Sequence, residues 1–180
     1  MSSEAVEKPA PARLQGPKAF TIALAVIVVD QLTKIWMLGS VFPAACMGFN
    51  PTPDPYTHCS VPVLGPFNLS MVWNQGVSFG LFRGEADWVR WVLAAFSLGV
   101  AIALGVWARR VERPILGVAI GLVMGGAIGN LVDRVRLGAV ADFLDFQGLM
   151  FPWVFNIADS GITIGVVLLL LDSLRRDVKA

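Results

Sequence analysis

The sequence has few charged residues, because only 15% of its 180 residues are Asp, Glu, Lys or Arg. A soluble domain of this length usually has about a quarter, so an ordinary soluble domain is excluded. Its single histidine, His58, excludes a zinc protease of the His-Glu-x-x-His type, which requires two. A net charge of only +1 gives no support to a nucleic-acid partner.

Apolar residues are abundant instead, at 56% of the chain, and the mean hydropathy is +0.68. Four segments are long and apolar enough to cross a hydrocarbon core of about 30 Å, which takes about 20 helical residues. They cover approximately 19–38, 88–108, 114–132 and 153–172. Because lipid tolerates only structures that satisfy their own backbone hydrogen bonds, we expect an all-α membrane fold, a bundle of four transmembrane helices.

The basic residues predict the orientation of these spans. Nine of the fourteen Lys and Arg residues lie in 1–18, in the connection 109–113 and in 175–180, which fall on one side if the helices alternate. By the positive-inside rule, both termini are expected in the cytoplasm, and 39–87 and 133–152 on the other side. We expect a disordered tail over 1–18, a single membrane domain over 19–174 and a second cytoplasmic tail over 175–180.

The first outer segment contains a proline-rich stretch and a predicted strand. Six prolines in 43–66 favour an irregular loop, since proline disrupts helices and central strands. Cys46 and Cys59 both lie in this stretch, and either a disulfide or two unpaired thiols is compatible with the sequence. The alternation in "NLSMVW" predicts a short strand, and "NQG" a turn, so a small sheet on the membrane surface is expected.

Glycines recur every fourth residue in the third span, which places them on one helix face. The repeat consists of Gly117, Gly121, Gly125 and Gly129. Such a stripe lets a neighbouring helix approach closely, and we interpret it as a packing feature. Gly161 and Gly165 repeat the spacing in the fourth span.

Polar residues gather at the outer ends of the third and fourth spans. Asn130, Asp133 and Arg134 share one helix face, because they are three and four residues apart. Asp142 follows in the connection, and Asn156 and Asp159 begin the fourth span. A short connection between antiparallel helices must bring these ends together, so at least two carboxylates are expected to converge at the membrane–water boundary.

Two chemical interpretations of this cluster remain open from the residues alone. One is a buried polar network that fixes helix register, with Asp133 paired to Arg134 or another cation. The other is a pair of carboxylates that share one proton, so that one activates water and the other polarises a carbonyl. A serine or cysteine nucleophile would have to recruit His58 from the proline-rich loop, so two aspartates are the protease chemistry that the composition favours. The spacing does not say which two.

Five blocks of this sequence resemble the bacterial lipoprotein signal peptidases, the type II signal peptidases. The blocks are "DQLTK" (30–34), "WNQGVSFG" (73–80), "GGAIGNLVDRV" (125–135), "VADFLDF" (140–146) and "FNIADS" (155–160). The resemblance implies that Asp142 and Asp159 are the catalytic aspartates. It implies supporting or substrate-binding roles for Asn130, Asp133, Arg134, Asn156, Asn74, Gly76, Asp30 and Lys34. Ser78 stands where the family often has alanine, and 43–66 looks longer than the corresponding region of the family.

The resemblance also implies the substrate and the location. An aspartic endopeptidase of this kind cleaves diacylglyceryl-modified prolipoproteins just before the lipidated cysteine, without a metal or other cofactor. The site would lie near the periplasmic face of the bacterial inner membrane, among membrane lipids. We expect a monomer, because no second glycine face clearly demands a partner helix.

Two rivals belong to other classes of protein. A small ion-coupled transporter would use intramembrane acids as relays, but the four spans show no internal repeat and the acids cluster at one boundary. A structural or assembly subunit would use the polar groups only to hold helices together. Substitution separates these hypotheses, because residues that only join helices affect folding, whereas a catalytic pair affects turnover.

Overall fold

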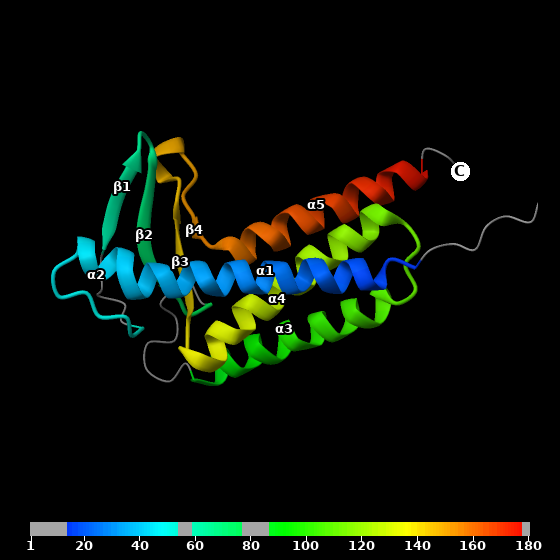
Figure 1. Ribbon diagram of the computed structural model, residues 1–180, viewed down its shortest axis with the longest axis horizontal. Coiled ribbons are helices and arrows are strands. Elements are labelled where there is room, and N and C mark those ends of the chain that lie inside the picture. Colours follow the sequence, from blue (N-terminus) through cyan, green and yellow to red (C-terminus); the bar gives the residue numbers. More distant parts are fainter. Residues whose placement is uncertain (1–13, 54–58, 77–86, 178–180) are drawn as a thin grey trace, which may run out of the picture.

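Four long helices form a bundle, and a small sheet lies across one end of it (Figure 1). This computed structural model describes residues 14–53, 59–76 and 87–177. The helices are α1 (Gly16–Trp36), α3 (Asp87–Ala108), α4 (Pro114–Arg136) and α5 (Ile157–Asp177). Each belongs to a helical segment long and apolar enough to cross a membrane. The predicted class, a four-span membrane bundle with a small sheet, is confirmed.

The central helix is α4, and α1, α3 and α5 all pack against it. Its glycines explain how the backbones approach. A Cβ added to Gly121 or Gly125 would lie 2.6 Å from the Ala19 oxygen or 2.7 Å from the Ala23 oxygen, both on α1. On the other side, a Cβ on Gly165 of α5 would lie 2.8 Å from the Ala119 oxygen of α4. The glycine stripe therefore serves close packing, as predicted.

The first span is longer than the predicted 19–38. Helix α1 continues through a π-helical turn, η1 (Met37–Val41), into α2 (Phe42–Ala45), so the helical segment covers Gly16–Ala45. Pro43 lies just after this π-helical turn, where the regular α-helical hydrogen-bond pattern is already interrupted. The prediction of an irregular loop from residue 43 is therefore wrong at its start.

The sheet has four antiparallel strands in the order β1-β2-β3-β4: β1 (Ser60–Leu64), β2 (Phe67–Asn74), β3 (Val140–Asp145) and β4 (Val154–Phe155). The predicted strand over "NLSMVW" is confirmed as β2. The irregular interpretation of 43–66 is wrong for β1 as well, because Pro62 lies in an edge strand, where proline is tolerated. The pairing of β4 with β3 also explains why α5 begins at Ile157 and not at the predicted 153.

An apolar core joins the sheet to the extension of α1. It comprises Met37, Phe42, Cys59, Met71, Trp73, Ala139, Ala141 and Phe143. A disulfide between Cys46 and Cys59, which the sequence left open, ties the end of α2 to the start of β1. Because Ala141 and Phe143 face this core, the alternation of a strand directs Asp142 toward the opposite face of the sheet. A 3₁₀ turn, η2 (Gln147–Leu149), follows β3.

Candidate active site

Asp159 lies in the first turn of α5 as part of a reciprocal cap. The Asp159 backbone N–H donates to Asn156 Oδ1 at 2.9 Å, and the Asn156 backbone N–H donates to Asp159 Oδ2 at 3.3 Å. This Asn-x-x-Asp arrangement has the geometry of a capping box and satisfies two backbone donors at once. A negative charge is also favourable at a helix N-terminus. The local sequence therefore fixes both the start of α5 and the position of its carboxyl group.

Asp142 lies in the middle of β3, and its neighbour on β2 holds one of its oxygens. Asn74 Nδ2 donates to Asp142 Oδ2 at 3.0 Å. Asn74 is itself fixed, because its Oδ1 accepts the backbone N–H of Gly76 at 2.8 Å. Gly76 has a φ of +86°, in the left-handed region where glycine is favoured. Asn74 and Gly76 thus orient Asp142 from the sheet side, with Asn74 in direct contact.

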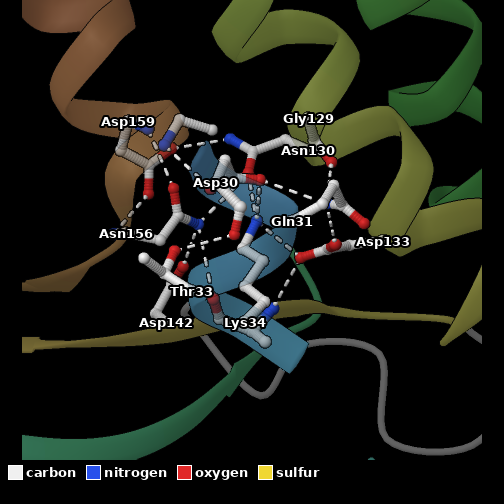
Figure 2. A network of polar contacts seen from close by, with 12 residues as sticks. Asp30, Gln31, Thr33, Lys34, Gly129, Asn130, Asp133, Asp142, Asn156 and Asp159 are labelled. Carbon is white, nitrogen blue, oxygen red and sulfur yellow. Dashed lines mark hydrogen bonds and ion pairs between the residues drawn. The ribbon is translucent and has the colours of Figure 1, made fainter. Parts of the chain in front are cut away.

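Two asparagines connect the two carboxyl groups (Figure 2). Asn156 Nδ2 donates to Asp142 Oδ1 at 2.7 Å and to Asn130 Oδ1 at 3.1 Å. Asn130 Nδ2 in turn donates to Asp159 Oδ1 at 2.7 Å. The chain of contacts runs from β3 through Asn156, the residue before α5, to α4 and then to the first turn of α5. Both carboxyl groups are therefore held by neutral amides.

Beside these two carboxyl groups lies an ion-paired cluster, formed by Lys34, Asp30 and Asp133. Lys34 Nζ lies 2.9 Å from Asp30 Oδ2 and 2.7 Å from Asp133 Oδ2, and all three side chains are at most 3% exposed. Asp133 is thus paired with Lys34, the alternative cation that the sequence left open, and the ammonium joins α1 to α4. Lys34 Nζ also lies 3.4 Å from Asn130 Oδ1, which links the two clusters.

Two backbone N–H groups close to Asp159 and Asp142 also donate to the aspartates of the ion-paired cluster. The Ala158 N–H donates to Asp30 Oδ1 at 3.0 Å, so α1 contributes to the cap of α5. The Ala141 N–H donates to Asp133 Oδ2 at 3.1 Å, so α4 fixes β3 one residue before Asp142. The ion-paired cluster therefore positions both segments.

Sequence reasoning missed Gln31, which lies between the two aspartates of the ion-paired cluster (Figure 2). Its Nε2 lies 3.1 Å from Asp30 Oδ2 and 2.9 Å from Asp133 Oδ1. The signal was its place beside Asp30 in the "DQLTK" block.

Arg134 lies at the edge of the network. Its Nη1 donates to the Asn130 carbonyl oxygen at 3.3 Å, and the charges of Asp159 and Asp142 act on its guanidinium. All ten residues singled out from the sequence thus lie in one connected region, with Gly76 and Arg134 at its periphery.

The electrostatics of Asp142 differ from those of an ordinary surface aspartate. Burial, and after it the charge of the neighbouring Asp159, raise the pKa of Asp142 from 3.8 to about 7. The hydrogen bonds from Asn74 and Asn156 and the charge of Lys34 oppose this increase only in part. Asp142 therefore retains a proton at pH values where most aspartates are ionised.

A pocket of about 370 Å³ lies beside Asp142, between the end of β2 and the segment that leads into β4. Its lining comprises Val72, Trp73, Asn74, Gln75, Gly76, Asp142, Gln147, Pro152, Trp153 and Val154. Within residues 14–53, 59–76 and 87–177, no group of three His, Cys, Asp or Glu side chains could hold a metal ion. His58 and Ser78 lie outside the described residues.

Helices of membrane length around a buried, amide-linked pair of carboxyl groups define the class: a multi-pass membrane protein with an acidic candidate site. A sequence model of the family described as "Signal peptidase (SPase) II" matches residues 22–175. The chain therefore belongs to the signal peptidase II family, which is a peptidase family.

Relatives agree with this assignment. The chain is 52% identical over 160 residues to a lipoprotein signal peptidase of Caulobacter vibrioides, with 88% of each chain covered. It is 43% identical over 154 residues to a lipoprotein signal peptidase of Methylorubrum extorquens, covering 84% of this chain and 82% of the relative. A solved structure described as a bacterial membrane enzyme is 30% identical, covers 88% of both chains and gives a TM-score of 0.67.

Proposed function

We propose that this peptidase cleaves diacylglyceryl-modified prolipoproteins just before the lipidated cysteine, with Asp142 and Asp159 as the catalytic pair. Family membership supports the reaction class, and the curated relatives are lipoprotein signal peptidases. The observation that carries the choice of residues is the contact of Asn156 with both acids. Its Nδ2 donates to Asp142 and its backbone N–H donates to Asp159.

This contact separates the catalytic pair from the other buried acids. Asp30 and Asp133 both form ion pairs with Lys34. Asp142 and Asp159 form no ion pair with a cation among the described residues, and amides leave both free to exchange protons. A pair of acids that cannot both ionise cheaply holds one proton between them.

The chemistry needs one acid and one base. We assign the proton to Asp142, because burial and the Asp159 charge raise its pKa to about 7. Asp159, in the first turn of α5, is the base. Asp159 removes a proton from water, the resulting oxygen nucleophile attacks the scissile carbonyl carbon, and Asp142 donates its proton to the carbonyl oxygen. The tetrahedral intermediate then collapses as the C–N bond breaks. The proton held by Asp159 passes to the leaving amine, and a hydroxyl group of the intermediate returns its proton to Asp142, so both acids regain their starting protonation states.

The position of the pair fits a lipidated substrate. Both acids lie where α4 and α5 meet the sheet, at one end of the bundle (Figure 1). Acyl chains do not enter bulk water, and water is scarce at the bilayer centre, so a boundary position serves both reactants. We assign this end to the periplasmic side of the inner membrane, with both termini in the cytoplasm. The pocket of about 370 Å³ beside Asp142 would receive the polypeptide around the scissile bond.

The test is cleavage of a diacylglyceryl-modified prolipoprotein by the purified protein in detergent. Asp142→Asn and Asp159→Asn should each lower kcat by at least about a thousandfold, because an amide cannot exchange the proton. Asp145→Asn is the matched control. Asp145 lies on the same strand, is buried and bonds to Ser70, so its substitution should leave kcat within a few-fold of wild type.

Asp159 also caps α5, so stability must be measured beside turnover. Loss of the cap alone costs about 1 kcal/mol and would lower the melting temperature without abolishing kcat. Substantial turnover in either Asp142→Asn or Asp159→Asn would remove that residue from the pair. A wild-type protein that leaves the lipidated substrate intact would overturn the proposed reaction.

A further inference from the structure

An apolar groove unrelated to the acid cluster runs between α1 and α3, with α4 as its floor. Its volume is about 550 Å³. The lining comprises Phe20, Ala23, Leu24, Ile27, Leu98, Ala101, Ile102, Gly105, Val106, Arg109, Met124, Ile128 and Leu131. Gly105 and Ala101 deepen it from the α3 side because their side chains are small or absent. None of the residues assigned to catalysis lines it.

The groove has the length of one leaflet. On α3 it runs from Leu98 to Arg109, which corresponds to about 16 Å at 1.5 Å per residue. The hydrocarbon core of a bilayer is about 30 Å thick, so the groove reaches from one membrane surface to about the centre. Arg109 marks the surface end, since it directly follows the end of α3 at Ala108.

Two arginines at that end of the bundle differ in their contacts. Arg113, four residues further on, forms a bidentate ion pair with Asp172, with both nitrogen–oxygen distances at 2.6 Å. Arg109 is exposed and forms no side-chain hydrogen bond or ion pair with any residue in 14–53, 59–76 or 87–177. Within the described part of the chain, the Arg109 guanidinium at the mouth of this apolar groove therefore has no charged partner.

The lining of the groove indicates its occupant. Arg109 is the one charged residue in the lining, and every other lining residue is apolar or, at Gly105, has no side chain. A groove that is apolar along its length and has a cation at its surface end complements a hydrocarbon chain with an anionic headgroup.

We propose that this groove is a binding site for an anionic phospholipid of the leaflet at the Arg109 end, with one acyl chain between α1 and α3. The phosphate of the headgroup lies against the Arg109 guanidinium. A bound chain fills the space that the small side chains of α3 leave beside α4, so the lipid stabilises the contact of α1 and α3. The site is independent of the peptidase chemistry and lies on another face of α4.

The experiment measures lipid retention by native mass spectrometry of the full-length protein in detergent, titrated with dioleoylphosphatidylglycerol or dioleoylphosphatidylcholine. Wild type should retain phosphatidylglycerol more tightly, and Arg109→Gln should weaken that retention about five-fold, toward the phosphatidylcholine value. Arg110→Gln is the matched control, because Arg110 is exposed at the same helix end but does not line the groove. It should behave as wild type.

A second pair of variants tests the acyl-chain slot. Gly105→Leu should fill the groove and abolish tight retention of both lipids, whereas Gly99→Leu, on an open face of α3, should not. If Gly105→Leu does not fold, Gly105→Ala is the milder variant, since its Cβ would only touch Met124 Sδ at 3.6 Å and Phe20 Cε1 at 3.7 Å. Equal retention of the two lipids, or retention unaffected by filling the groove, would overturn the proposal. Displacement of the lipid by an apolar helical peptide would do the same.

Discussion

At the scale of single residues, the network contains acids of two kinds. Asp30 and Asp133 are buried and form ion pairs with Lys34. Asp142 and Asp159 are held by the amides of Asn74, Asn130 and Asn156. Neutral donors fix the position of a carboxyl group without forming an ion pair with it. Asp142 and Asp159 are therefore suited to proton transfer, and Asp30 and Asp133 to joining helices.

Asp142 predicts a pH dependence of stability. Its folded-state pKa is raised from 3.8 to about 7, so its stabilising contribution is complete below pH 3.8 and is lost as the pH rises through about 7. The difference corresponds to at most about 4 kcal/mol. The melting temperature in detergent should therefore fall between pH 4 and pH 8, and Asp142→Asn should flatten this fall. The same slope in Asp142→Asn and in the control Asp145→Asn would contradict the assignment.

The buried ion pairs of Lys34 predict that removal of its charge strongly destabilises the protein. Lys34→Met leaves Asp30 and Asp133 buried without a counter-charge, which costs about 3–5 kcal/mol. We expect a clear drop in melting temperature, measured by differential scanning fluorimetry in detergent. Lys18→Met, at an exposed position of the same helix, should have almost no effect. Equal melting temperatures for the two variants would show that the ion-paired cluster does not hold α1 to α4.

At the scale of elements, the sequence predicted helices and polar ends well but not the sheet edges. The apolar count of 153–172 made Trp153, Val154 and Phe155 look like membrane residues, yet Val154 and Phe155 pair with β3. Hydropathy measures apolar content alone and cannot distinguish burial in a sheet from burial in lipid. The prolines of 43–66 likewise did not reveal α2 or β1, because proline is accommodated just after a π-helical turn and on an edge strand.

The sequence predicted which residues belong to the polar network, but not which of them pair with each other. Spacing placed Asn130 and Asp133 on one face of α4, and the structure confirms that face. That Lys34 and not Arg134 neutralises Asp133 depends on the packing of α1 against α4, which spans almost a hundred residues of sequence. The role of Gln31 was not predicted for the same reason, since its partners on α4 come from a distant part of the chain.

The close contact of α1 and α4 predicts the effect of a single methyl group. A Cβ on Gly125 would lie 2.7 Å from the Ala23 oxygen and 2.9 Å from the Ala23 Cα, and these backbone atoms cannot move aside without shifting α1. Gly125→Ala should therefore destabilise the protein by about 1–3 kcal/mol. It should also lower turnover, since Asp30 on α1 accepts the backbone N–H of Ala158, the residue before Asp159.

The matched control is Gly99→Ala on α3, where an added Cβ meets nothing within 4 Å. There the helix propensity of alanine should leave stability unchanged or raise it by up to about 1 kcal/mol. Both effects are read as melting temperatures, with turnover measured at a temperature where both variants are folded. A Gly125→Ala variant as stable and active as Gly99→Ala would mean that α1 and α4 can separate without loss.

At the scale of the whole molecule, the two ends of the bundle differ in composition (Figure 1). One end carries the sheet, the disulfide and both acid clusters. The other end carries the described start of α1, the end of α5 and the ion pair of Arg113 with Asp172. Basic residues concentrated at the second end and a disulfide at the first both favour a cytoplasmic second end and an oxidising first end.

This polarity predicts which residues a reagent outside the cell can reach. Leu64, which is 79% exposed in the β1–β2 hairpin, and Arg110, exposed beside α3, lie at opposite ends of the bundle. We expect a membrane-impermeant maleimide applied to spheroplasts to label Leu64→Cys but not Arg110→Cys, and to label both after the membrane is permeabilised. The native cysteines stay silent because they are paired with each other. Labelling of Arg110→Cys in sealed spheroplasts would reverse the orientation and place the acid pair on the cytoplasmic side.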